Sequence, residues 1–527
     1  MTANRVVIAE PFAESGLDVL RDRGIEVDVR VGSPREALLR ALVGAAGLIV
    51  RSETRVDREL LDSGASLRVV GRAGVGVDAI DVGAATDAGI VVLNTPSANT
   101  IAATEHTFAL LLSLVRHLSA AHESLKRGEW KRAPFVGTEL FGKSLGIVGL
   151  GRIGGAVATR AAAFGMEVLA SDPFVTAARA QAHGATLLPL DELLGRVDIL
   201  TVHVPLNAQT LGLIDAKYIG RLKSSALVVN CARGGVIDEH ALLEALESGR
   251  VRGAAIDVVR EEPPPPQSPG ALLHRHAHVV ATPHLGGSTH EALARIATEL
   301  ARDVANVLEG RPADGAVNAP IAGGADAHTL RPFVDVAHRM GVIFPQLRES
   351  PMRSLVLTVR GEIAECNARP LAAAFLSGLL AQTTDRRVSI VNAEALAREL
   401  GIVLDVRCVR EHDAYAGSIA ISDGENSLVG TSLHNGARIV EIDGFEVDAI
   451  PSGALIVTRH SDVPGMIGRV GTALGDAGFN ISTMQVARSS QGGEAMMVLS
   501  VDRPLDAPAL EALRAIPMIR SVRALAV

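Results

Sequence analysis

A glycine-rich hexapeptide that joins a short apolar run to a helical segment constrains this chain most. Gly149-Leu150-Gly151-Arg152-Ile153-Gly154 follows the β-rich run 145–148. Glycines with this spacing permit a tight turn, the close approach of a ligand to the backbone and the packing of a helix on a strand, while the helix N-terminus offers amide donors to a pyrophosphate. Asp172 lies 18 residues after Gly154, where a carboxylate binds ribose hydroxyls and repels a 2′-phosphate. The pattern predicts a Rossmann-type domain that binds NAD rather than NADP.

Alternating β-rich and amphipathic runs extend this α/β pattern over most of the N-terminal part. A long helix over 100–127 separates two series of strands, and a further helix is expected over 288–309. Such alternation predicts two Rossmann-like lobes with parallel sheets. The run 263–266, with Pro269 beyond it, consists of prolines and predicts an exposed loop. The expected strands are 6–9, 47–51, 67–71 and 90–94 in the first lobe, and 144–148, 167–171, 198–203, 226–230, 253–258 and 278–281 in the second.

The C-terminal part has a different organisation. Residues 310–327 are rich in Gly, Ala and Pro and predict a domain boundary. The segment 329–451 mixes strand-like and helical runs, which predicts an α+β domain without a recognisable catalytic pattern. From residue 454 the expected order is β, α, β, β, α, β, which is typical of a small ferredoxin-like domain.

Composition excludes several classes of protein. With 59 acidic and 51 basic residues the net charge of the 527-residue chain is −8, which disfavours general affinity for nucleic acid or for acidic membranes. Three scattered cysteines, Cys231, Cys366 and Cys408, are too few for a disulfide framework or a metal cluster, so we expect no metal. The N-terminus has no signal-peptide pattern and no apolar stretch spans a membrane, so we expect a cytoplasmic location.

Three ionisable residues follow expected strands of the second sheet, where open α/β sheets bind their ligands. Oxidation of a secondary alcohol needs a base for the hydroxyl proton, and His284 has the side chain whose ordinary pKa lies nearest neutrality. Glu262 is placed to orient that imidazole, and Arg233 offers a fork for a carboxylate. By spacing alone, a capping or surface role is the alternative for each of the three residues. Asp257 either ends a strand or receives the nicotinamide amide.

Several motifs together resemble those of D-2-hydroxyacid dehydrogenases, in the long form with an intervening domain and a C-terminal ACT domain. They are Gly71-Arg72-Ala73-Gly74-Val75-Gly76-Val77-Asp78, the 149–154 loop, Ala232-Arg233-Gly234-Gly235, Glu262-Pro263 and Thr282-Pro283-His284. The chain departs from the family at Ala79, where Asn is usual, and in a slightly longer proline-rich loop. The resemblance implies a substrate-binding lobe over 1–98 plus 288–315, an NAD-binding domain over 99–287, an intervening domain over 318–452 and an ACT domain over 454–527.

The resemblance also implies a role for each matching residue. Arg233 would anchor the substrate, Glu262 would support the histidine and His284 would be the acid/base. Arg51, Arg72 and Arg132 match phosphate anchors, the last reaching in from a neighbouring subunit, while Gly74 and Gly76 would turn their amides to the substrate carboxylate and Asn99 matches a further substrate-side position. Besides Gly149, Gly151 and Gly154, cofactor contacts would fall on Val75, Arg152, Ile153, Asp172, Val204, Cys231, Ala232, Asp257 and Gly286.

The implied reaction is the NAD-dependent oxidation of (R)-3-phosphoglycerate to 3-phosphooxypyruvate, the first step of the phosphorylated route to L-serine, in a homo-oligomer expected to be a tetramer. In the last domain His460, Asp462 and Asn480 resemble the effector site of ACT modules, which implies feedback by L-serine. Other interpretations remain open at this point: a dehydrogenase of another D-2-hydroxy acid, a non-catalytic NAD-sensing regulator, an ACT domain that serves only assembly, and an Asp462 that merely caps a helix.

Overall fold

The first sheet in the chain is parallel and buried on both faces. The computed structural model describes residues 4–527 apart from 312, 321–324, 349–351, 385 and 412–413, so parts of the expected 310–327 boundary lie outside the described residues. The sheet order is β2-β1-β3-β4-β5. Strand β2 lies on one side of β1, whereas β3, β4 and β5 follow on the other side, so the strand order reverses between β1 and β3. The strands are β1 (Arg5–Ile8), β2 (Glu26–Val29), β3 (Gly47–Val50), β4 (Val69–Arg72) and β5 (Val91–Leu93).

Helices cover both faces of this first sheet. Leucines of α2 (Arg35–Leu42) and α3 (Arg58–Ser63), with alanines of α4 (Val82–Asp87), pack on one face. On the other face α1 (Glu14–Asp22) packs beside α13 (His290–Leu308), which is distant in sequence. Leu300 of α13 is fully buried against this core, so the chain returns to the first lobe after crossing the second.

The second sheet contains seven parallel strands in the order β12-β11-β10-β9-β6-β7-β8. Its direction of growth reverses between β6 and β9, and ligands of open α/β sheets bind at the carboxyl edge beside such a reversal. The strands are β6 (Ser144–Val148), β7 (Glu167–Ser171), β8 (Thr186–Leu187), β9 (Ile199–Val202), β10 (Leu227–Asn230), β11 (Gly253–Ile256) and β12 (Val279–Ala281).

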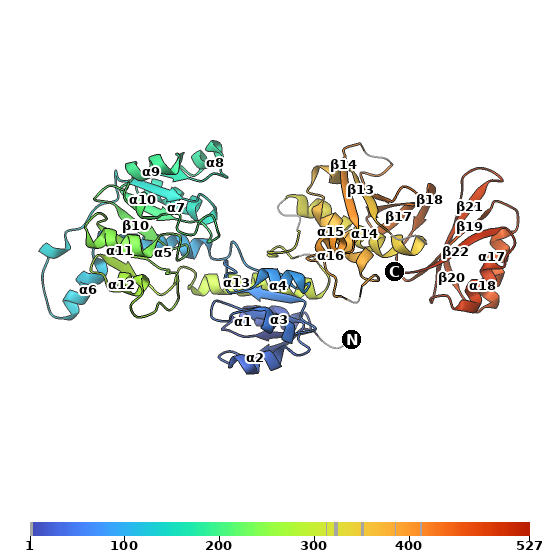
Figure 1. The fold of residues 1–527 in the computed structure, drawn as a ribbon, viewed down its shortest axis with the longest axis horizontal. Helices are drawn as coiled ribbons and strands as arrows, with labels where there is room; N and C mark the ends of the chain where they lie inside the picture. Colours follow the sequence, from blue (N-terminus) through green and yellow to red (C-terminus); the bar gives the residue numbers. More distant parts are fainter. Residues whose placement is uncertain (1–3, 312, 321–324, 349–351, 385, 412–413) are drawn as a thin grey trace.

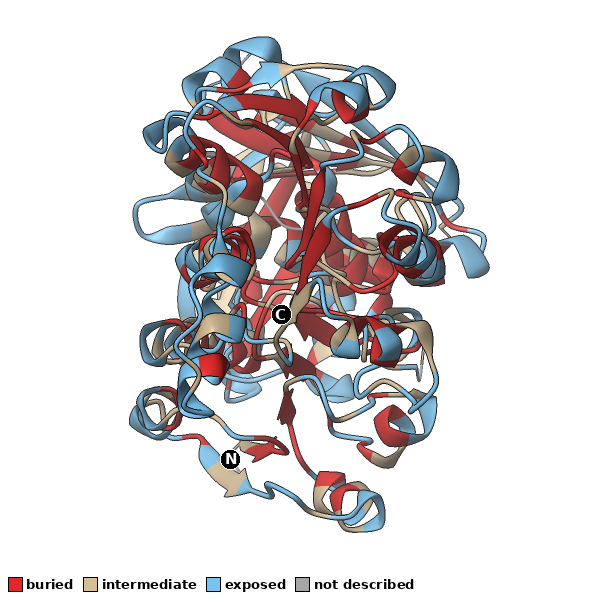
Figure 2. Cartoon of the chain, turned by 90° about the vertical axis from the view of Figure 1, so that its left-hand side faces the viewer, coloured by how far each residue is buried: buried red, intermediate tan, exposed pale blue. Residues whose placement is uncertain are grey.

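Both faces of the second sheet are also covered, as the buried strands and exposed outer helices of Figure 2 show. Helices α5 (Thr100–Val115) and α7 (Arg152–Ala163) pack on one face. The other face carries α9 (Leu190–Arg196), α10 (Ala216–Ile219), α11 (Glu239–Glu247) and α12 (Pro269–Arg275). The two expected parallel-sheet lobes are therefore confirmed.

Three details differ from the sequence-based expectations. The helix expected over 100–127 is two helices, α5 and α6 (Leu118–Lys126), because His117 between them adopts a left-handed φ of 53°. Strands β2 and β8 lie at the sheet edges and were not expected, since β2 is largely polar and β8 has two residues. Pro269 opens α12 rather than lying in a loop, which is compatible with proline because the first helical N–H needs no partner.

The intervening domain has a mixed sheet in the order β14-β13-β15-β16-β17-β18, in which only β13 and β14 run parallel. Helices α14 (Ala325–Ile343), α15 (Arg369–Leu380) and α16 (Ala393–Glu399) enclose its core. This agrees with the expected α+β class. The strands are β13 (Ser354–Gly361), β14 (Val403–Val409), β15 (Gly417–Ser422), β16 (Ser427–Leu433), β17 (Gly436–Ile442) and β18 (Phe445–Ala449).

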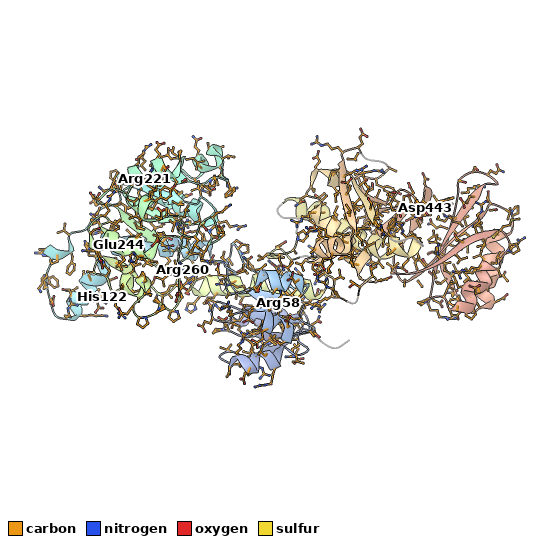
Figure 3. The ribbon with its side chains drawn as sticks, viewed as in Figure 1. Arg58, His122, Arg221, Glu244, Arg260 and Asp443 are labelled. Atoms are coloured by element: carbon orange, nitrogen blue, oxygen red, sulfur yellow. The ribbon has the colours of Figure 1, made fainter. Side chains whose placement is uncertain are left out.

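The last domain has the expected ferredoxin-like order, with an antiparallel sheet β20-β21-β19-β22. One face of this sheet carries α17 and α18, and the other contributes Leu455 and Val498 to the core of the intervening domain. Asp443, labelled in Figure 3, binds Arg459 at 2.5 Å across this contact. The elements are β19 (Ala454–Ser461), α17 (Met466–Asp476), β20 (Ile481–Arg488), β21 (Glu494–Val501), α18 (Ala507–Arg514) and β22 (Ile519–Ala526).

Figure 1 shows the four units one after another along the molecule in the order second lobe, first lobe, intervening domain and last domain, so the first lobe lies between the second lobe and the intervening domain. The segment 387–392 joins the intervening domain to the first lobe: Arg387 donates to the carbonyl of Leu67, and Val391 packs against that lobe's core. Among the helices described, none combines the length and apolar character needed to cross a membrane.

Candidate active site

The carboxyl edge of the second sheet gathers most of the residues expected at the site. The glycine loop follows β6, Asp172 follows β7, the segment Cys231–Arg233 follows β10, and Asp257 follows β11. His284 lies three residues beyond the end of β12. Because all seven strands are parallel, these segments emerge on the same side of the sheet.

The three glycines of the loop differ in their surroundings. Gly149 has a φ of 91°, and a Cβ there would lie 2.7 Å from the carbonyl oxygen of His203. A Cβ on Gly154 would collide with the carbonyl oxygen of Gly149, so this glycine allows α7 to pack on the loop. A Cβ on Gly151 would meet nothing within 4 Å, which leaves open space at the N-terminus of α7 for a pyrophosphate.

The carboxylate of Asp172 is held beside this loop. Its Oδ2 accepts the Leu150 N–H at 2.8 Å and its Oδ1 accepts the Phe174 N–H at 2.9 Å. Each oxygen retains a lone pair for a ribose hydroxyl. The loop and this carboxylate therefore fit a bound NAD.

Cys231 lies near the expected nicotinamide position. Burial, together with the nearby charge of Asp257, raises the pKa of the Cys231 thiol to about 12. The thiol is therefore neutral at physiological pH and is not activated as a nucleophile.

His284 and Glu262 form a hydrogen-bonded pair in which Nδ1 of the imidazole lies 2.6 Å from Oε2 of the carboxylate. The second carboxylate oxygen accepts the backbone N–H of Val259 at 3.2 Å. The side chain of His284 is 37% exposed, so its Nε2 remains accessible to a substrate. A carboxylate on Nδ1 fixes the ring orientation and favours the tautomer with a free Nε2 lone pair.

A buried carboxylate, that of Asp257, holds the loop that carries His284. Its Oδ1 accepts the Leu285 N–H at 2.7 Å and its Oδ2 accepts the Gly286 N–H at 2.8 Å. The hydroxyl of Thr282 donates to Oδ1 at 2.6 Å, and Nε2 of His106 lies 3.1 Å from the same oxygen. Burial alone would raise the pKa of Asp257, but hydrogen bonds from His106, Thr282 and Leu285 lower it below its ordinary value.

The backbone of Asp257 also contributes to this arrangement. Its carbonyl oxygen accepts the N–H of His284 at 2.8 Å, and His284 has a left-handed φ of 56°. Such a conformation is costly for a residue other than glycine and persists only where its surroundings enforce it. The hydrogen bonds of Asp257 provide that enforcement.

Arg233 reaches from the NAD-binding lobe toward the first lobe. The buried side chain of Asn230 braces its loop by donating to the carbonyl of Arg233 at 2.9 Å. The Arg233 Nε donates to Oδ2 of Asp78 at 3.3 Å, which links the two lobes. A Cβ on Gly76 would overlap the Arg233 guanidinium, so this glycine makes room for the arginine.

Arg51 and Arg72 lie near Arg233 and have few counter-charges. Burial, followed by the like charges of Arg233 and Arg51, lowers the pKa of Arg72 to about 10, so Arg72 stays protonated at neutral pH. Within the described residues the guanidinium of Arg51 forms no ion pair. Three cations with a single carboxylate partner, Asp78, form a site suited to a multiply charged anion.

Asn99 and Arg132, the other two residues expected on the substrate side, lie in different parts of the structure. Asn99 precedes α5 and lies beside Gly287, where the lobes meet. Arg132 is exposed at the start of a short 3-10 helix after α6. Among the described residues no hydrogen bond or ion pair joins Arg132 to Arg51, Arg72 or Arg233, so its expected reach into a neighbouring subunit stays a prediction.

The loop that carries Gly74 and Gly76 does not depend on a side chain at position 79. Thr95 donates its N–H to the carbonyl of Gly74 at 2.9 Å, and the Asn94 side chain donates to the carbonyl of Val75 at 2.5 Å. Ala79 takes part through its carbonyl oxygen, which accepts the Val56 N–H at 2.8 Å.

In the last domain Asp462 does not cap the helix that follows it. The residue that precedes α17 is Gly465, and no side chain caps this helix. Asp462 instead accepts the Gly492 N–H at 3.0 Å, which lowers its pKa, and lies 3.5 Å from Arg488. His460 is buried with its Nδ1 unpartnered, and burial lowers its pKa, while Asn480 is exposed just before β20.

Sequence reasoning missed several residues that shape the site. They share one signal, which is a polar side chain buried or half-buried at a strand end or on an otherwise apolar helix. The residues are Glu10, His106, Asn230 and Thr282. The contact of Asp78 with Arg233 was also missed, and Asp78 is exposed, so it lacks this signal.

The fold and the site together define a D-isomer specific 2-hydroxyacid dehydrogenase. The family model of the NAD-binding domain of these enzymes matches residues 108–286. A model of the D-3-phosphoglycerate dehydrogenase intervening domain matches residues 329–443, and an ACT domain model matches residues 454–517. The chain is 41% identical over 525 residues to the D-3-phosphoglycerate dehydrogenase of Bacillus subtilis (98% of this chain, 99% of that protein).

A second relative, the D-3-phosphoglycerate dehydrogenase of Archaeoglobus fulgidus, is 40% identical over 513 residues, which cover 96% of this chain and 97% of that protein. The chain belongs to the D-3-phosphoglycerate dehydrogenase family.

Solved structures resemble the N-terminal part of the chain. A protein from Thermus thermophilus is 37% identical with a TM-score of 0.55, covering 59% of this chain and 99% of that one. D-lactate dehydrogenase from Aquifex aeolicus, solved with NAD and lactic acid, is 27% identical with a TM-score of 0.53, covering 58% of this chain and 96% of that one.

The glycine geometry predicts opposite outcomes for two alanine substitutions. Gly151→Ala should fold, because its Cβ meets no atom, yet should weaken NAD binding at least tenfold, because the methyl group enters the pyrophosphate space. Gly154→Ala should lower the thermal midpoint, because its Cβ overlaps the Gly149 carbonyl. Calorimetric NAD titration and thermal melts measure both effects. Normal NAD affinity in Gly151→Ala would contradict this placement of the pyrophosphate.

Proposed function

We propose that the site residues described above oxidise (R)-3-phosphoglycerate to 3-phosphooxypyruvate with NAD, the first step of the phosphorylated route to L-serine. Membership of the D-3-phosphoglycerate dehydrogenase family gives the reaction. The observation that carries the assignment of residues is the grouping of Arg51, Arg72 and Arg233 in one cluster, with the loop of Arg233 packed at Gly234 against Val259, whose N–H binds Glu262. A phosphorylated hydroxy acid has two anionic ends and a hydroxyl between them, which matches this arrangement.

The chemistry of the chain's own groups follows from their positions. Bound NAD supplies a nicotinamide that accepts a hydride. Nε2 of His284 takes the hydroxyl proton as the hydride leaves, and Glu262 stabilises the resulting imidazolium through Nδ1. Arg233 holds the substrate carboxylate, with the amide of Gly76 beside it. The expected contribution of Gly74 is not supported, because its N–H donates to the carbonyl of Arg72 at 2.8 Å. Arg51 and Arg72 then face the phosphate.

The assignments of Asp172, Val204, Ala232, Gly286 and the other expected cofactor contacts belong to the same proposal. So do the domain limits: 1–98 plus 288–315 for the substrate-binding lobe, 99–287 for the NAD-binding domain, 318–452 for the intervening domain and 454–527 for the ACT domain. The return of α13 to the core of the first lobe supports the discontinuous limits.

A homo-oligomer, with a tetramer as the proposed state, accounts for the position of Arg132. The arm between α5 and β6 exposes large apolar side chains, including Trp130 at 82% and Phe141 at 78%, which is typical of a surface covered by another chain. If a second copy packs on this arm, Arg132 enters the neighbouring substrate site. The proposed compartment is the cytoplasm.

Replacement of the catalytic pair tests the acid/base assignment. His284→Ala should lower kcat by about 100-fold or more, because general acid–base catalysis contributes roughly 10² to 10⁴. Glu262→Gln should lower kcat less, because its amide oxygen still accepts from Nδ1 but carries no charge. Stopped-flow NADH formation measures kcat, and the NAD dissociation constant serves as the control. A fully active His284→Ala enzyme would rule out this role.

Substrate comparison tests the arginine cluster. We expect NADH formation with D-3-phosphoglycerate to exceed that with D-glycerate or D-2-hydroxyglutarate. Arg51→Ala should raise the KM for D-3-phosphoglycerate by about tenfold or more, because a charge-assisted hydrogen bond contributes roughly 1.5–3 kcal/mol, and should leave D-glycerate turnover unchanged. Arg55→Ala, an exposed arginine four residues on, is the matched control. Better turnover of an unphosphorylated acid would favour another dehydrogenase, and NAD binding without turnover would favour a regulator.

We propose that L-serine binds at the β19–α17 turn of the ACT domain, with Asp462 facing its ammonium group and the amides near Gly465 facing its carboxylate. Asp462→Ala should then raise the L-serine concentration for half-inhibition by at least tenfold. Asp476→Ala, exposed on α17, is the control. Wild-type activity that is indifferent to millimolar L-serine would indicate an ACT domain that serves assembly alone.

A further inference from the structure

One buried carboxylate in the first lobe contacts four consecutive backbone amides. Glu10 is 6% exposed and follows β1 by two residues. Its Oε1 accepts the N–H groups of Arg51 and Thr54, both at 2.9 Å. Its Oε2 accepts those of Ser52 at 3.1 Å and Glu53 at 3.2 Å. A single side chain therefore fixes the backbone of the whole segment 51–54.

The topology of the sheet places this contact beside the substrate site. Strands β1 and β3 are parallel neighbours at the reversal point of the first sheet, and Ala9 donates its N–H to the carbonyl of Ile49 at 3.0 Å. The residues that follow the two strands, Glu10 and Arg51, consequently leave the same edge side by side. Open α/β sheets bind ligands at such an edge.

The charge of Glu10 is compensated by amides rather than by arginines. Burial alone would raise the pKa of Glu10, but hydrogen bonds from the backbone of Arg51, Thr54 and Glu53 lower it below its ordinary value. The carboxylate is therefore ionised, and its partners are N–H dipoles. Among the described residues Glu10 forms no ion pair with Arg51 or Arg72, although its charge acts on Arg72 through space, so both guanidinium groups can contact another anion.

The contact with Glu10 also determines the direction of the amides of residues 51–54. All four N–H groups of 51–54 point at Glu10, so none of them is available to a substrate phosphate. Binding of an anion at this edge must then rely on side chains, and the position of the Arg51 side chain depends on the backbone that Glu10 holds.

We propose that Glu10 is a positioning residue that sets the preference for a phosphorylated substrate by fixing the segment that carries Arg51. This inference rests on the proposed role of Arg51 as a phosphate anchor. Glu10 is buried and both of its carboxylate oxygens are occupied by backbone amides, so we expect its effect to fall on substrate binding rather than on hydride transfer.

Glu10→Gln tests the inference, because glutamine has the same shape but one acceptor oxygen, and its amino group faces N–H donors. At least two of the four amides lose their partner. We expect the KM for D-3-phosphoglycerate to rise about tenfold, as in Arg51→Ala, with kcat and the kcat/KM for D-glycerate within about twofold of wild type. Glu53→Gln, an exposed residue of the same segment, is the isosteric control and should match wild type.

A double-mutant cycle separates positioning from general destabilisation. If Glu10 acts through Arg51, adding Glu10→Gln to Arg51→Ala should not raise the KM further. An additive effect, or equal losses with D-3-phosphoglycerate and D-glycerate, would overturn the inference. Glu10→Asp keeps the charge on a shorter side chain and should give an intermediate KM, which keeps the test decisive if Glu10→Gln does not fold.

The two proposals fail in different ways. An Arg51→Ala enzyme that keeps its preference for the phosphorylated substrate refutes the phosphate anchor, whatever Glu10 does. A selective loss in Arg51→Ala together with a normal Glu10→Gln enzyme refutes only the positioning role. The NAD dissociation constant of each variant verifies that the second lobe is intact.

Discussion

The carboxylate of Asp257 is the contact on which the catalytic edge of this enzyme depends. It directly follows β11, and it collects the amides of the loop after His284, the hydroxyl of Thr282 and the imidazole of His106 on α5. A buried charge is costly unless hydrogen bonds compensate it, and here the compensating groups belong to the segments that must be held. The left-handed backbone of His284 and the direction of its imidazole follow from this arrangement.

The first lobe also has a buried carboxylate that binds backbone amides, at the point where the strand order of its sheet reverses. Glu10 stands at the end of β1 as Asp257 stands at the end of β11, and each gathers backbone amides from the loop that bears a functional side chain. Between the two loops Arg233 contacts Asp78 of the opposite lobe. Each lobe thus has an edge organised around a carboxylate, and the segment 387–392 of the intervening domain contacts the first lobe.

Much of this could be predicted from sequence because parallel strands deliver their following residues to one edge. The glycine loop and Asp172 could be predicted from the local pattern, and so could the positions of Arg233, Glu262 and His284 after strands, whereas the roles of these three residues needed the family resemblance. The contacts between distant segments could not be predicted, since neither the pairing of Arg233 with Asp78 nor that of His106 with Asp257 leaves a local pattern. The helix break at His117 could not be predicted either, because a histidine with a left-handed backbone conformation has no sequence signature comparable to that of glycine. A role for Arg132 in a neighbouring subunit cannot be predicted from the pattern of a single chain.

The central claim is that one substrate lies across both edges, with its phosphate on Arg51 and Arg72 and its carboxylate on Arg233. The most direct measurement is a crystal structure of the His284→Ala enzyme, which should turn over too slowly to consume its ligands, with NAD and D-3-phosphoglycerate bound. We predict phosphate oxygens within hydrogen-bonding distance of Arg51 and Arg72, the carboxylate on Arg233, and the hydroxyl carbon facing both the nicotinamide and position 284. A substrate bound in the reverse direction, or a phosphate held away from Arg51 and Arg72, would contradict the account.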